Sequence, residues 1–110
     1  MLVYLTLAVA IIGEITATVS LKLSEGFSKP IPSVVVIVGY VVAFGALSRV
    51  LHLGMPIGVA YAIWSAFGVA AVAGIGVVVF EEPLNATMVV GLLLVIAGVV
   101  AIEVGSGAAA

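Results

Sequence analysis

Four long apolar segments constrain this chain more than any other feature of its sequence. Each is about as long as the roughly 20 predominantly apolar residues that an α-helix needs to cross a bilayer. Open strands cannot span lipid, because their backbone groups would lack hydrogen-bond partners there. The sequence therefore predicts an all-α membrane protein with four transmembrane helices, at Leu2–Leu23, Ser33–Leu53, Ile57–Phe80 and Ala86–Val104.

The composition supports this class. Of the 110 residues, 65% are hydrophobic and 7% are charged, against about 25% charged residues in a typical soluble domain. The mean hydropathy is +1.54. We expect a single four-helix domain over residues 1–110, with a disordered tail at 105–110, as a multi-pass protein of the inner (plasma) membrane.

Several function classes are disfavoured by the same composition. The chain has no cysteine, so it can form neither a disulfide nor a thiolate metal site. The formal net charge of −2 is too small to suggest a nucleic-acid partner. We expect no enzyme activity, no metal and no organic cofactor.

Short polar turns separate the four segments. Pro30 and Pro32 break one helix and can open the next, and Pro56 precedes the third segment. Asn85 is a predicted N-cap of the fourth. Because all the loops are short, consecutive helices should be antiparallel neighbours, with both termini on one side of the membrane.

The basic residues give the chain little preference for one orientation. Lys22 and Lys29 lie at the first loop, and Arg49 lies near the opposite side with the amino terminus. Orientation follows the Lys/Arg bias of short loops. The near-even balance predicts that the same chain can insert both ways.

Glu14 interrupts the first apolar segment near its middle. A charge at such a position costs about 2.5–3.5 kcal/mol on insertion scales, and intramembrane carboxyls are functional by default. Protonation avoids most of that cost, so we expect Glu14 to bind a proton or, once ionised, a cation. Its helical neighbours Ala10, Ala17 and Thr18 are small and leave room beside the carboxyl. A purely structural hydrogen bond to another helix is the alternative.

Aromatic residues at depth suggest what kind of cation would bind. Tyr61 and Trp64 are three residues apart and share a helix face, Ser65 flanks them, and Tyr40 lies in mid-helix. Desolvated aromatic faces attract cations by about 2 kcal/mol or more. With Glu14 they would suit a large, weakly hydrated organic cation, whereas a small metal ion needs more oxygen ligands. Core packing remains the alternative for each aromatic residue taken singly.

Tyr4 and the glycines of the fourth segment complete the set of candidates. Tyr4 could line the same cavity as Glu14 or anchor the helix at the interface. Gly91 and Gly98 are seven residues apart on one face, and small residues let helices approach closely in lipid. Since the remaining three helices are too few to enclose a bulky ligand, we expect a dimer held by the fourth helices.

These residues carry a resemblance to a known family. The glutamate in "GEITATVSLKLSEGF", Tyr40, the "AYAIWSAFG" block and the glycine-spaced "GLLLVIAGVV" resemble the small multidrug resistance family of proton-coupled exporters. The resemblance extends from Tyr4 to about Val100. It implies an antiparallel, dual-topology homodimer in which the residue matching Glu14 binds substrate and protons alternately.

The family resemblance also implies site residues and a substrate class. Residues matching Tyr40, Tyr61 and Trp64 line the cation site, and a small residue matching Thr18 flanks it. The guanidinium-exporting branch typically has a Trp soon after the glutamate, where this chain has Ile15, Thr16 and Ala17. The chain therefore resembles the multidrug branch, which exports hydrophobic or quaternary ammonium cations. Guanidinium export, or one half of a heterodimeric exporter pair, is the alternative.

Overall fold

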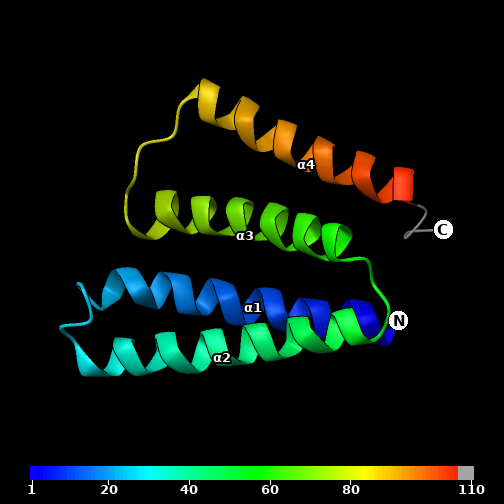
Figure 1. Cartoon of the computed structure of the whole chain (residues 1–110). Coiled ribbons are helices and arrows are strands. Elements are labelled where there is room, and N and C mark those ends of the chain that lie inside the picture. The colour runs from blue at the N-terminus through cyan, green and yellow to red at the C-terminus, as the bar shows by residue number, and fades with distance from the viewer. Residues whose placement is uncertain (107–110) are drawn as a thin grey trace. The chain divides into compact units, whose positions relative to one another are not determined.

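The computed structural model describes residues 1–106, and within them it contains four α-helices and no strand (Figure 1). All four helices are long and apolar enough to cross a membrane. The prediction of an all-α membrane protein with four transmembrane helices is confirmed. The helices are α1 (Leu2–Leu23), α2 (Pro30–His52), α3 (Ile57–Val79) and α4 (Ala86–Ser106).

Two helix boundaries differ from the prediction by more than one residue. Helix α2 begins at Pro30 rather than Ser33, because proline lacks an N–H and has a preset φ that suit the first turn of a helix. Helix α4 extends to Ser106, so the first two residues of the predicted disordered tail are helical. There the Ser106 hydroxyl donates a hydrogen bond to the backbone oxygen of Glu103 at 3.0 Å. The rest of that predicted tail, residues 107–110, lies outside the described residues.

The helices form two antiparallel pairs. One compact unit spans Met1–Gly54 and contains α1 and α2, and the second begins at Met55 and contains α3 and α4. The association of all four helices in a single domain stays a prediction.

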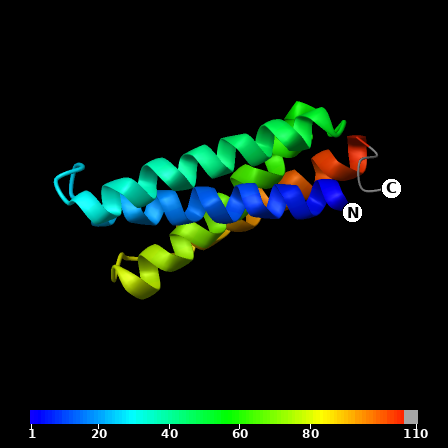
Figure 2. The ribbon, with the colours of Figure 1, turned by 90° about the horizontal axis from the view of Figure 1, so that it is seen from below.

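Small residues bring α1 and α2 into close contact, and both views show these two helices side by side (Figures 1 and 2). A methyl group added to Gly39 would lie 2.8 Å from the Ala17 Cβ, and one added to Gly13 would lie 3.3 Å from the Ala43 backbone nitrogen. In lipid, such close backbone approach supplies the van der Waals contact that holds helices together.

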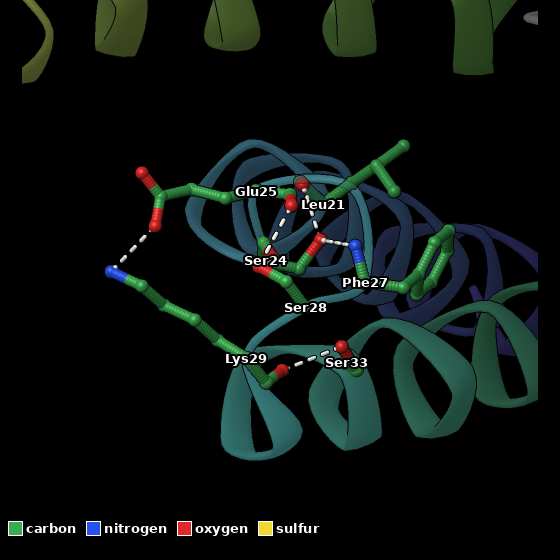
Figure 3. A network of polar contacts seen from close by, with 7 residues as sticks. All are labelled: Leu21, Ser24, Glu25, Phe27, Ser28, Lys29 and Ser33. Carbon is green, nitrogen blue, oxygen red and sulfur yellow. Dashed lines mark hydrogen bonds and ion pairs between the residues drawn. The ribbon is translucent and has the colours of Figure 1, made fainter.

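The α1–α2 loop is organised around Ser24, which is fully buried. Its hydroxyl donates to the Leu21 backbone oxygen at 2.7 Å and accepts from the Phe27 backbone N–H at 3.1 Å (Figure 3). The Ser24 backbone oxygen accepts from the N–H groups of Ser28 and Lys29. These bonds satisfy backbone groups that the end of α1 and the turn would otherwise leave unpaired.

An ion pair lies on the exposed side of this loop. Lys29 Nζ is 2.9 Å from Glu25 Oε2 (Figure 3), and the hydrogen bond and positive charge of Lys29 hold the pKa of Glu25 below its usual value. Glu25, Gly26 and Phe27 all have positive φ, at 48°, 72° and 65°. Only Gly26 adopts that conformation without steric cost.

The α3–α4 connection is fixed by backbone and side-chain caps. The Gly76 carbonyl accepts from the N–H groups of Phe80 and Glu82, an arrangement that satisfies the end of α3. The Asn85 side chain accepts from the Met88 N–H at 2.9 Å. The prediction that Asn85 caps the fourth helix is confirmed.

Candidate functional site

Glu14, Thr18 and Tyr40 form a chain of hydrogen bonds between α1 and α2. Glu14 and Thr18 are one turn apart on α1, and the Thr18 hydroxyl donates to Glu14 Oε1 at 2.8 Å. The Tyr40 hydroxyl, from α2, lies 2.8 Å from the same Thr18 oxygen. An ionised carboxylate can only accept, and Thr18 has one proton to donate. The Tyr40 hydroxyl must therefore donate to Thr18 when Glu14 is ionised.

The second oxygen of the Glu14 carboxyl has a different environment. Oε2 is buried and has no hydrogen-bond partner among residues 1–106. A buried polar atom without a partner is unfavourable, and a buried charge more so. The carboxyl thus has one oxygen held by Thr18 and one free to take a proton or a cation.

Two glycines that the sequence analysis did not select position this cluster. Gly13 precedes Glu14, Gly39 precedes Tyr40, and the two glycines face each other across a close contact of α1 and α2. The signal available in the sequence is the spacing of small residues, with Gly13 and Ala17 four apart and Gly39 and Ala43 four apart. Such small-xxx-small patterns mark close helix contacts in membranes.

Two other predicted site residues of α1, Ala10 and Tyr4, precede Glu14 in the helix. Ala10 is buried, one turn before Glu14. Tyr4 is 40% exposed and lies ten residues before Glu14, about 15 Å along the helix at 1.5 Å per residue. Tyr4 is therefore distant from the cluster of Glu14, Thr18 and Tyr40.

Tyr40, on α2, has a further aromatic neighbour in Phe44, with ring centroids 6.3 Å apart. The i, i+4 spacing of these two aromatic residues could have indicated this pair.

The predicted aromatic residues of α3 do contact each other. Tyr61 and Trp64 meet edge-to-face, with centroids 6.2 Å apart and an interplanar angle of 65°. Trp64 is only 6% exposed, whereas Tyr61 is 62% exposed. Ser65 is half-buried. Their convergence with Glu14 on one bound cation stays a prediction.

Helix α4 leaves most of its surface unpacked within the described chain. It has no buried residue, and a methyl group added to Gly91 or Gly98 would meet nothing within 4 Å. An apolar helix with open glycines is what a helix–helix contact with a second chain would require. The assignment of these glycines to a dimer interface stays a prediction.

Fold and site together define a class of protein. An intramembrane carboxyl with a buried free oxygen, in a chain that is nearly all transmembrane helix, is typical of proteins that move ions or solutes across membranes. The family model described as Small Multidrug Resistance protein matches residues 2–95. The chain belongs to this family.

Individual relatives agree along almost the whole chain. The quaternary ammonium compound-resistance protein QacE of Escherichia coli is 47% identical over 107 residues, covering 97% of this chain and 96% of the relative. A multidrug transporter of Pseudomonas aeruginosa is 45% identical over 105 residues, covering 96% and 94%. The multidrug resistance protein mmr of Mycolicibacterium paratuberculosis is 43% identical over 100 residues, covering 91% and 94%.

Class and cellular location follow from the family. These relatives are named as transporters or resistance proteins rather than as enzymes. The protein is accordingly a multi-pass protein of the inner membrane, with a transport-type rather than an enzymatic role.

Proposed function

We propose that this protein is a proton-coupled antiporter that exports hydrophobic or quaternary ammonium cations. The observation that carries the proposal is the Glu14 carboxyl, with Oε1 held by Thr18 and Oε2 buried without a partner. The relative named for resistance to quaternary ammonium compounds supports the substrate class.

Exchange follows from competition for one group. A protonated Glu14 is neutral and does not attract an organic cation, and a cation bound to the carboxylate disfavours its protonation. Each ligand therefore leaves before the other binds, and proton entry drives cation exit if the site opens to one side of the membrane at a time. The proton is the coupling ion, and the scheme uses no metal or organic cofactor.

Aromatic and small residues would shape the cation site. The faces of Tyr40, Tyr61 and Trp64 favour a cation once water is excluded. Ala10, Thr18 and Ser65 are small and leave room for it, and Tyr4 would lie at its outer edge. The complete site requires a second chain, and we propose an antiparallel homodimer whose fourth helices meet at Gly91 and Gly98.

Substitution of Glu14 tests the function directly. Glu14→Gln keeps the size and hydrogen bonding of the side chain but cannot titrate, so we expect folded protein without coupled transport in proteoliposomes. Glu14→Asp should retain some activity with an altered pH profile, because its carboxyl is withdrawn by one methylene. Glu81→Gln, at an exposed loop residue, is the control. Dye efflux at the wild-type level in Glu14→Gln would refute the proposed role.

Binding as a function of pH tests the competition separately. The dissociation constant for a lipophilic cation should rise as the pH falls, and addition of the cation to purified protein should release protons. If the two Glu14 residues of a dimer share a cavity, only apparent values for the pair are meaningful. A dissociation constant that stays the same between about pH 5 and pH 9, the range in which buried carboxyls of proteins have been found to titrate, would contradict competition.

A further inference from the structure

A groove lies between α3 and α4, inside the second helical unit. Its volume is about 240 Å³. Its lining comes from one face of each helix, because the contributing residues are spaced by four and then three. They include Ile63, Phe67 and Ala70 of α3, and Ile96, Val100 and Glu103 of α4. Helices α3 and α4 lie nearer each other where α3 begins and α4 ends than at their connecting loop (Figure 1).

Glu103 gives the groove one charged end. It is half-buried and lies in the last turn of α4, where the helix carbonyls add partial negative charge. From Met55 to the end of the chain the sequence contains no Lys, Arg or His. The helical unit that holds the groove therefore has no basic side chain to neutralise Glu103. The rest of the lining is apolar, and it extends from Glu103 to Ile96, about 10 Å along α4 at 1.5 Å per residue.

We propose that this groove is a second binding site, for a cationic amphiphile of the alkyl quaternary ammonium type. The ammonium would lie beside Glu103, and the alkyl chain would lie against Ile96 and the exposed ring of Phe67. Lipid tails are as apolar as leucine side chains, so the apolar wall alone cannot select a ligand from the bilayer. The carboxylate would favour a ligand with a positively charged head group, and the apolar wall would favour one with an attached alkyl chain.

This site shares no residue with the Glu14 cluster. The inference takes its ligand class, organic cations, from the proposed function but does not depend on Glu14. A cation held at Glu103 would be concentrated from the bilayer at the end of a transmembrane helix pair.

Photolabelling in a background without Glu14 tests the inference. The Glu14→Gln protein is reconstituted in phosphatidylcholine nanodiscs and exposed to dodecyltrimethylammonium with a diazirine in its chain. We expect crosslinks at residues 63–70 and 96–103, located by mass spectrometry. Unlabelled dodecyltrimethylammonium should compete, whereas dodecanol, which lacks the charge, and tetramethylammonium, which lacks the chain, should not.

Further substitutions at Glu103 separate charge from packing. Glu103→Gln should reduce groove labelling about tenfold, a loss within the range of the charge–charge attraction near a protein surface, and Glu103→Asp should restore most of it. Glu81→Gln, which changes an exposed carboxylate outside the groove, should leave labelling unchanged. Helicity measured by circular dichroism should be the same in all variants.

Three results would overturn the proposal. Labelling that Glu103→Gln leaves unchanged would show that the groove takes up hydrocarbon only. Equal labelling by a diazirine analogue of dodecanol would show the same. Absence of groove labelling by either probe would mean that another surface, such as a second copy of the chain, covers this face. Coupled transport that persists in Glu14→Gln would refute the proposed function instead, and would leave the groove labelling to be judged separately.

Discussion

Gly13 and Gly39 lie so close together that a side chain on either would crowd the backbone of the other helix. A Cβ on Gly13 would lie 3.1 Å from the Gly39 backbone oxygen, and one on Gly39 would lie 3.0 Å from the Gly13 backbone oxygen. The residues that follow them, Glu14 and Tyr40, are joined through Thr18. The hydrogen-bond chain thus lies beside a close contact of the two backbones, and we expect it to depend on that contact.

Gly39→Ala should therefore weaken cation binding although it touches no ligand. The added methyl group must push the helices apart, because it would meet the Ala17 Cβ at 2.8 Å, and overpacking of this kind typically costs about 1–3 kcal/mol. We expect a lower unfolding midpoint in detergent and a raised dissociation constant. Gly45→Ala is the matched control on the same helix, since a Cβ there meets nothing within 4 Å. Equal behaviour of the two variants would remove the positioning role of Gly39.

Removal of either hydroxyl from the Glu14–Thr18–Tyr40 hydrogen-bond chain should reduce cation affinity by about 2- to 10-fold, the range of one net hydrogen bond. The variants are Thr18→Val and Tyr40→Phe, and the measurement is calorimetric binding at fixed pH. Because the two share one bond, the double variant should lose less than the sum of the single losses. Thr16→Val is the control, since that hydroxyl only bonds back to Ile12 on an exposed face. Strictly additive losses of cation affinity would argue that the two hydroxyls do not act through one hydrogen-bond chain.

Trp64→Leu should lower affinity for aromatic and quaternary cations while the dimer is retained. Leucine keeps an apolar side chain but has no π-face, and a desolvated cation–π contact contributes about 2 kcal/mol, or roughly 30-fold in affinity. Fluorescence titration with a cationic dye measures the effect, and size-exclusion chromatography checks the dimer. Normal binding by Trp64→Leu together with impaired binding by Tyr4→Leu would show that we have assigned the cation–π contact to the wrong aromatic residue.

Gly98→Leu should increase the monomer fraction in detergent, and transport should fall as a result. The Gly98 position is open within the described chain, so leucine fits the monomer and obstructs only a second helix. Gly91→Leu should act in the same direction. Gly45→Leu, on α2 and equally open, is the control for added bulk. A fully dimeric Gly98→Leu protein would place the interface elsewhere.

Two or three lysines added after Val104 should force most chains into one orientation, because Lys/Arg bias sets topology. Homodimer transport should then drop, since antiparallel partners become scarce. Co-expression with a variant carrying extra lysines in the first loop should restore it. Labelling of an introduced Ala108→Cys from each side of the membrane reports the orientations. If the chain without added lysines labels from one side only, dual topology is wrong.

The membrane class and the number of helices could be inferred from the sequence, and Glu14 could be selected from it as a candidate site residue. Apolar length decides whether a segment can span lipid, and an acidic residue at that depth is rare enough to identify itself. Both are properties of single segments, so no knowledge of neighbouring helices is needed. The Asn85 cap belongs to the same local kind of information.

Contacts between helices were beyond such reasoning. Thr18 was predicted as a small neighbour of Glu14, but its hydrogen bond to Tyr40 joins residues 22 positions apart, and that bond depends on how α1 and α2 cross. The roles of Gly13 and Gly39 depend on the same crossing, since in sequence they are two glycines among 13. Likewise, the sequence places Glu103 only near the end of the fourth apolar segment. Only the packing of α3 against α4 shows that it ends an apolar groove, because a groove is formed by two surfaces and neither helix defines it alone.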